Sequence, residues 1–154
     1  MKRLHNKVRV LVADGGRALV LHNEGDAESP NLKLVRSYGQ DNPPTHEQGA
    51  DKPGRMNDGL GRLSAMEAAD WHQIAEDRFI QTVAADMAKD LAAGEFTALV
   101  VLAPPNALGE YRKSVTPSLA KATICEIDKD FTKHPMAQIE KAVVAALEKA
   151  SFER

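Results

Sequence analysis

Residues 96–103 read Phe-Thr-Ala-Leu-Val-Val-Leu-Ala, a continuous apolar run with the length of one β-strand. A strand with one face in water alternates polar and apolar residues, whereas a continuous run is typical of a strand buried on both faces. We therefore expect residues 96–103 to form a central strand of a sheet that helices cover. Pro104 and Pro105 follow the run and end it.

The N-terminal part of the chain predicts antiparallel strands. Residues 8–13 and 18–21 are rich in β-branched and aliphatic side chains, and a Gly15-Gly16 pair lies between them. Two glycines suit the positive φ angles of a two-residue hairpin turn, so this segment predicts a β-hairpin. Residues 32–38 begin with alternating apolar and polar residues, which predicts a third strand.

A long helix is predicted over residues 71–93, where apolar side chains recur at spacings of three and four and mark one face. Two capping boxes could open this helix, one headed by Ser64 and one headed by Asp70. We take Asp70, because the glycines and Leu63 upstream fit poorly with an earlier turn. Gly94 is a suitable stop at the other end.

The remaining elements alternate. Short helices are expected from Pro105 to about residue 113 and after Thr116, a strand over residues 122–127, and a last helix from Pro135. The order β-β-β-α-β-α-β-α predicts one α/β domain over residues 1–154, with a mixed sheet of about five strands. The same order occurs in ribonuclease H-like folds.

Charge and hydropathy exclude several classes of protein. The longest apolar run, residues 98–103, is far shorter than the roughly 20 residues of a membrane-spanning helix. The basic start lacks the apolar core of a signal peptide, so we expect a cytoplasmic protein. A single cysteine, Cys125, forms no internal disulfide. The formal net charge is −2, which gives no reason for indiscriminate binding to nucleic acid. It conceals a basic N-terminus (residues 1–9) and an acidic segment (residues 64–95), whose acids we expect to be solvated.

Catalytic signatures are weak. Two-metal nucleases of the ribonuclease H type need clustered carboxylates, and residues 97–103 contain no acid, so we exclude that reading. No Gly-x-Ser-x-Gly or phosphate-binding sequence is present. His72 and Glu76 are spaced i,i+4, which could bind zinc if His46 or Glu47 approached them. An exposed polar pair is the simpler interpretation, and we expect no cofactor or metal.

Residues 39–63 hold five glycines and three prolines, and they have no strand or helix period. We predict a loop of about 25 residues, far longer than the usual ~4–6. Its cations include Arg55 and Arg62, and arginines in a flexible loop can dock on phosphates, although simple solvation explains them equally well.

The sequence His-Glu-Gln-Gly-Ala-Asp-Lys-Pro-Gly-Arg at residues 46–55 resembles a signature of the bacterial host-attachment protein family. Other segments match that family in the right order, so that the resemblance covers nearly the whole chain: residues 12–18, 70–72, 78–79, 103–112 and 126–132. The resemblance implies a part in the attachment of bacteria to host cells. It also implies a fold related to the middle domain of eukaryotic and archaeal peptide-chain release factors.

In those release factors, a loop before the long helix carries Gly-Gly-Gln into the peptidyl-transferase centre of the ribosome. Residues 39–63 lie at the corresponding place but contain Gln48-Gly49 and no Gly-Gly-Gln. This departure speaks against peptidyl-tRNA hydrolysis and leaves contact with the ribosome or with tRNA open.

Our leading hypothesis is a non-catalytic interaction module that contacts ribosome or RNA through residues 39–63. The candidate binding residues are His46, Glu47, Asp51, Arg55, Arg62 and His72. The alternative is a hydrolase, with or without a metal, that uses the first three of these residues together with His72. A third hypothesis makes residues 39–63 a dimerisation arm, so a homo-oligomer is possible.

Overall fold

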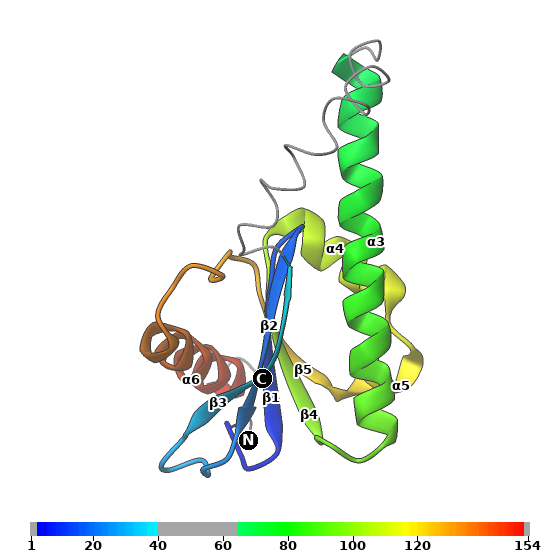
Figure 1. Ribbon diagram of the computed structural model, residues 1–154. Helices are drawn as coiled ribbons and strands as arrows, with labels where there is room; N and C mark the ends of the chain where they lie inside the picture. Colours follow the sequence, from blue (N-terminus) through cyan, green and yellow to red (C-terminus); the bar gives the residue numbers. More distant parts are fainter. Residues whose placement is uncertain (1–2, 40–64, 153–154) are drawn as a thin grey trace.

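The computed structural model of the chain describes residues 3–39 and 65–152 (Figure 1). In this part the predicted elements follow in the predicted order, with two short helices between the last two strands, and the fold is a mixed α/β fold with one five-stranded sheet. The strands are β1 (Val8–Ala13), β2 (Arg17–Asn23), β3 (Leu32–Gly39), β4 (Ala98–Leu102) and β5 (Thr123–Ile127). The helices are α3 (Ala65–Ala92), α4 (Pro105–Ser114), α5 (Pro117–Ala122) and α6 (Met136–Phe152).

The strand order in the sheet is β3-β2-β1-β4-β5. β1 is antiparallel to β2 and parallel to β4, and β4 is parallel to β5. β4 is thus paired on both sides, which confirms the prediction of a buried interior strand from residues 96–103. The middle place belongs to β1, in which all six residues are buried.

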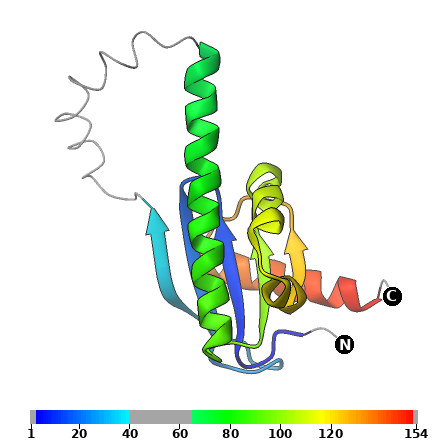
Figure 2. The ribbon, with the colours of Figure 1, turned by 90° about the vertical axis from the view of Figure 1, so that its right-hand side faces the viewer.

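Helices cover both faces of the sheet. α3, α4 and α5 lie on one face and α6 lies on the other (Figures 1 and 2). Alternate residues of β1 serve the two sides: Leu11 and Ala13 join the core beneath α3, whereas Val10 and Val12 join the core beneath α6. This division follows from the two-residue period of a strand and explains why β1 has no polar face.

The β1–β2 hairpin is confirmed, but the predicted positive φ angles at its glycines are wrong. In the described residues, the glycines with positive φ are Gly39 (102°) and Gly94 (80°). The Asp14 carboxylate closes the turn instead, because its Oδ1 accepts hydrogen bonds of 2.8 Å from the backbone N–H groups of Gly16 and Arg17. Gly39 is constrained by its neighbour, since a Cβ there would lie 2.3 Å from the carbonyl oxygen of Gly16.

The start of α3 was predicted wrongly. The helix begins by Ala65, six residues before the predicted first residue, and Asp70 lies inside it and is no cap. Residues 65–69 read Ala-Met-Glu-Ala-Ala, which are strong helix formers, so the intrinsic propensity carries the helix through Asp70. Gly94 follows the C-terminal end as predicted, with its N–H donating to the carbonyl of Leu91. At 1.5 Å per residue, the 28 residues of α3 span about 42 Å.

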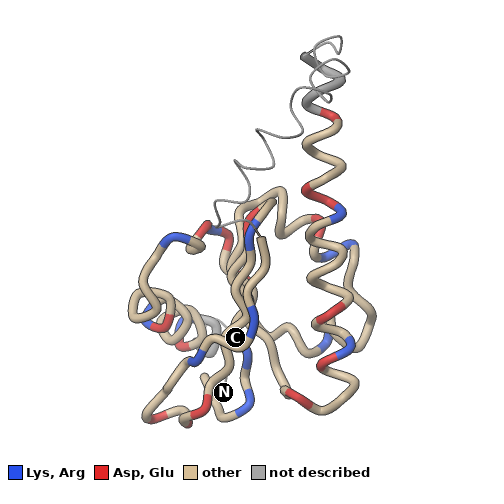
Figure 3. Tube along the Cα trace, in the orientation of Figure 1, with Lys and Arg blue, Asp and Glu red and all other residues tan. Residues whose placement is uncertain are grey.

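Part of the charge asymmetry of the sequence is an internal ion-pair system: the expectation of solvated acids holds for the exposed Asp70 and Glu76 but is wrong for Asp90. Asp90 of α3 accepts from Arg9 of β1 and Arg36 of β3, each at 3.0 Å. The Arg9 side chain is only 6% exposed, and its Nε donates to Nδ1 of His22 at 3.0 Å. Figure 3 shows that acidic and basic residues alternate along α3.

Tyr38 adds a second link between β3 and α3. Its hydroxyl donates to Asp86 at 2.6 Å, and its ring meets Phe79 edge-on with centroids 6.1 Å apart. Burial and the bond to Asp86 raise the pKa of Tyr38 to about 12. The C-terminal part of α3 is therefore fixed to the sheet by polar as well as apolar contacts. No described helix has the length and apolarity that crossing a membrane requires.

Candidate functional site

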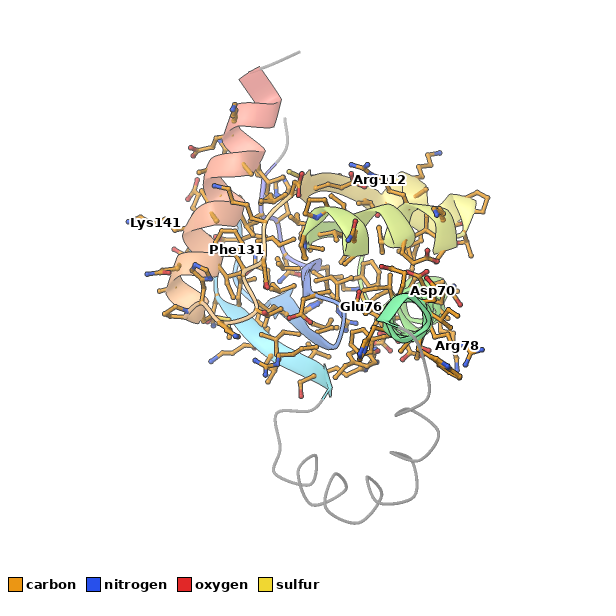
Figure 4. The ribbon with its side chains drawn as sticks, turned by 90° about the horizontal axis from the view of Figure 1, so that it is seen from above. Asp70, Glu76, Arg78, Arg112, Phe131 and Lys141 are labelled. Carbon is orange, nitrogen blue, oxygen red and sulfur yellow. The ribbon has the colours of Figure 1, made fainter. Side chains whose placement is uncertain are left out.

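Several segments that are distant in sequence meet at one end of the sheet, where the parallel strands β1, β4 and β5 finish. The β1–β2 turn, the start of α4 and the connection from β5 to α6 all lie there, beside the middle of α3 (Figures 1 and 4). In open α/β sheets, ligands bind at the carboxyl ends of parallel strands. The described segments that carried the family resemblance are concentrated at this end.

The hydroxyl of Thr132 links the β5–α6 connection to the β1–β2 turn by hydrogen bonds. Thr132 is 6% exposed, and its Oγ1 lies 2.6 Å from Oδ1 of Asp130 and 3.2 Å from Oδ2 of Asp14. Burial acts to raise the pKa of Asp130, but hydrogen bonds from the Thr132 side chain and backbone outweigh it and lower that pKa. Asp14 thus acts as a turn residue, and both of its carboxylate oxygens accept hydrogen bonds.

A cleft of about 280 Å³ opens beside this cluster, between α3 and the start of α4. Its lining includes Gly15, Gln73, Glu76, Asp77, Pro105 and Asn106. The Glu76 side chain lies on the β1–β2 turn so closely that a Cβ on Gly15 would be 2.6 Å from its Cδ. Figure 4 shows Glu76 on the side of α3 that faces this turn, and Arg78 on the side that faces away.

The cleft continues along α4 into a second hollow of about 360 Å³. Gln73 and Asp77 line both parts, and the second part adds Glu110 and Lys113. Glu110 Oε2 accepts from Nε2 of Gln81 at 3.0 Å, and this bond lowers the pKa of Glu110. The carboxylate of Glu110 is therefore held in place and ionised.

An ion pair fixes α4 to the last strand at the same end of the sheet. Nε and Nη2 of Arg112 donate to Oε1 of Glu126 at 2.8 and 2.5 Å. The bond to Glu126 raises the pKa of Arg112. Arg112 belongs to residues 103–112, which carried part of the family resemblance. Its ion pair holds α4, which forms one wall of the cleft and of the second hollow, in position.

Most of the predicted site residues lie outside the described residues. These are His46, Glu47, Asp51, Arg55 and Arg62, so their roles stay predictions. The hypothesis of a hydrolase, in which the first three of these residues act together with His72, also stays a prediction. His72 itself is exposed on α3, as is Glu76. Within residues 3–39 and 65–152, no three His, Cys, Asp or Glu side chains are grouped to hold a metal ion.

The N-terminal part of α3 corrects a further expectation. The apolar face predicted over residues 71–93 includes Trp71 and Ile74, but these side chains are 57% and 45% exposed. Every residue over 70–76 is exposed, and from Asp70 onward the first buried residue of the helix is Ile80. The helix outruns the sheet, so its first turns have no described surface to pack on (Figures 1 and 2).

The sequence did not predict four polar residues that line the cleft or its continuation along α4, together called the groove from here on: Gln73, Asp77, Asn106 and Glu110. Each is an ordinary polar residue on a helix, and only the meeting of α3 with α4 gives these residues a common site. The Pro104-Pro105 pair was the available signal, because it marks the tight exit from β4 that directs α4 toward α3.

The comparisons with known proteins found a matching family model and a similar solved structure. A family model described as "Bacterial archaeo-eukaryotic release factor family 12" matches residues 7–143. A crystal structure of the archaeal translation termination factor aRF1 matches 94% of this chain with 11% sequence identity and a TM-score of 0.46. The match covers 40% of the length of that factor. No curated protein matches the sequence. The family description does not mention host attachment, so that part of the resemblance stays a prediction.

Proposed function

The chain belongs to bacterial archaeo-eukaryotic release factor family 12, and from this membership we propose that it acts in translation as a ribosome-binding module. In this proposal the module binds rather than catalyses, because residues 39–63 contain no Gly-Gly-Gln. It works in the cytoplasm, where ribosomes are found.

The observation that most supports the proposal is the end of α3 that projects past the sheet. It carries two exposed apolar side chains, Trp71 and Ile74, three residues apart on one helix face. An aromatic side chain in an exposed position can stack on an unpaired RNA base or insert into a protein pocket. A projecting helix can bring such a side chain into a crevice of a large particle while the sheet stays outside.

The chain order adds the second part of the proposal. Residues 40–64 join Gly39, at the end of β3, to Ala65, at the projecting end of α3. They contain Arg55 and Arg62, which we propose to bind ribosomal RNA phosphates. In this proposal His46, Glu47, Asp51 and His72 contribute further polar contacts around these two arginines.

Co-sedimentation with ribosomes at moderate salt tests the proposal. We expect the protein to pellet with ribosomes, and the double variant Arg55→Ala, Arg62→Ala to bind about tenfold more weakly, with a shallower dependence on salt because two phosphate contacts are lost. A charge-matched control is Lys129→Ala with Lys141→Ala, which removes two exposed cations from another part of the surface.

Two outcomes would overturn the proposal. The first is the absence of any association with ribosomes. The second is an equal loss of association in the arginine pair and in the lysine pair, which would indicate a general charge effect rather than a site. Trp71→Ala gives an independent readout of the projecting helix, because it changes no charge.

A further inference from the structure

We propose that the groove between α3 and α4 binds a basic side chain, an arginine or a lysine, presented by an extended segment of a partner protein. The groove is formed by the cleft at Gly15 and its continuation along α4. This inference does not rest on ribosome binding, and none of the residues that line the groove is among those proposed to contact the ribosome.

The size and shape of the groove suit one side chain and the backbone that carries it. The cleft holds about 280 Å³, just below the roughly 300–1,000 Å³ of sites that enclose a drug-sized molecule. Four residues line both parts of the groove, so the two parts are continuous: Gln73, Asp77, Pro105 and Asn106. A peptide can therefore lie along the groove with one side chain in the cleft.

The charges of the groove favour a cation. Three carboxylates line it, from Glu76, Asp77 and Glu110, against the single cation Lys113 among the lining residues that the structure describes. Two of the three are already held: Gln73 donates to Asp77 at 2.8 Å, and Gln81 donates to Glu110. No hydrogen bond or ion pair within the described residues engages Glu76, whose carboxylate is thus available to an incoming ammonium or guanidinium group.

The walls of the cleft suit the apolar part of the same side chain. Ile80, which is 3% exposed, and Pro104 and Pro105 supply apolar surface beneath the carboxylates. Lysine and arginine have methylene stems that pack on apolar surface while the charged end reaches a polar rim. The N-terminus of α4 also borders the cleft and favours an anion, but Pro105 has no N–H, and the carboxylates outweigh the remaining partial charge.

Gly15 explains why the cleft keeps its form. A Cβ at this position would meet three atoms of the Glu76 side chain at 2.6–2.9 Å, so any other residue would displace that side chain. The absence of a side chain at Gly15 lets the Glu76 carboxylate lie over the β1–β2 turn at the mouth of the cleft. Substitution at Gly15 can therefore disturb the site without changing any charge.

Nuclear magnetic resonance on the full chain tests the inference, with a five-residue peptide of alternating glycine and arginine as the probe. We expect amide shifts concentrated at Gly15, Gln73, Glu76, Asp77 and Asn106. The glutamate counterpart of the peptide should produce no such shifts. Shifts of the same size scattered over the acidic surface, or shifts from the glutamate peptide at the same residues, would overturn the proposal.

Fluorescence anisotropy of the labelled arginine peptide gives the affinity. The variant Glu76→Gln with Asp77→Asn should bind about tenfold more weakly, since two exposed charge pairs each contribute a few-fold. Gly15→Ala should weaken binding at unchanged net charge. The control Glu148→Gln removes an exposed acid from α6 and should leave the affinity unchanged.

The side chains of Glu76 and Asp77 are outside the core, so the double variant should keep the unfolding temperature of the unaltered protein, which circular dichroism checks. Unchanged affinity in this variant, or an equal loss in Glu148→Gln, would overturn the proposal. So would tight binding of an RNA oligonucleotide that shifts the same groove residues, because an acidic groove should repel phosphates.

Discussion

The two halves of α3 differ in how they relate to the rest of the molecule. From Ile80 onward the helix contributes Val83, Ala84 and Met87 to the core, and its Asp90 pairs with two arginines of the sheet. Over residues 70–76 every residue is exposed. One continuous helix therefore anchors itself with its C-terminal half and presents its N-terminal half. An apolar residue at helical spacing therefore indicates a core only where a sheet or another helix lies opposite it.

The largest expected effect lies in the anchored half. Met87 is fully buried in the core beneath α3, and Met87→Ala should lower the free energy of unfolding by about 2–5 kcal/mol, because it removes packed atoms and leaves a cavity. Urea denaturation measures this loss. A change below about 1 kcal/mol would mean that the two halves of α3 differ less than the structure indicates.

The next effect concerns the ion pairs that hold the same half. Arg9→Met should cost about 1–3 kcal/mol, because Arg9 is buried and donates to both Asp90 and His22. Arg36→Met is the matched control, since it removes the other partner of Asp90 from a side chain that is 35% exposed. Arg36→Met should cost less, because solvent screens a more exposed pair. An equal cost in the two variants would contradict the assignment of Arg9 as the buried anchor.

A smaller effect is expected from pH. Burial and the neighbouring Arg9 guanidinium lower the pKa of His22 below its usual 6.5, and the remaining charges near it are those of Lys7, Glu24 and Glu95. The unfolded chain therefore binds this proton more readily than the folded chain. The stabilising contribution is complete above pH 6.5 and is lost as the pH falls toward the pKa of the folded state.

Thermal unfolding at pH 7.5 and pH 5.5 measures this loss. The variant His22→Gln can still accept a hydrogen bond from Arg9 but does not titrate, so its unfolding temperature should fall less between the two pH values than that of the unaltered protein. An equal decrease in the unfolding temperature of both proteins would contradict the prediction that protonation of His22 destabilises the fold.

The smallest effect on stability is expected in the presented half. Trp71→Ala should change the free energy of unfolding by no more than about 0.5 kcal/mol, because the side chain is 57% exposed. The same variant should reduce co-sedimentation with ribosomes if the proposed function is right. A loss of stability above 1 kcal/mol would show that Trp71 packs in the folded protein, and the contrast between the halves would then fail.

Local sequence patterns predicted the elements well. The strand over residues 8–13 was placed with its exact bounds, because β-branched residues and the following glycines define it locally. The start of α5 after Thr116 was also predicted, and Thr116 Oγ1 accepts a hydrogen bond from the N–H of Leu119 at 3.1 Å. In both cases the deciding interactions lie within a few residues.

Features that depend on contacts between distant parts of the chain could not be predicted from the sequence. Arg9 and Asp90 are 81 positions apart, and nothing in either neighbourhood indicates the partner. The exposure of Trp71 depends on where the sheet ends relative to α3, which is a property of packing. The groove arises from polar residues of α3 and α4 that acquire a shared role only through tertiary contact. The candidate residues between 46 and 62 lie outside the described part, so their prediction still awaits its test.

The pairing of β1 with β4 has a consequence for the time course of folding. Val8 lies beside Ala98, so the central strand gains its parallel neighbour only after about 90 further residues have been made. At the ribosomal rate of ~5–20 residues per second, this takes roughly 5–20 s. The β1–β2–β3 meander can form by local contacts during this time, but one edge of β1 stays open. The apolar strand that follows α3 closes this edge of β1, so we expect the newly made chain to be vulnerable to aggregation until residue 102 has emerged.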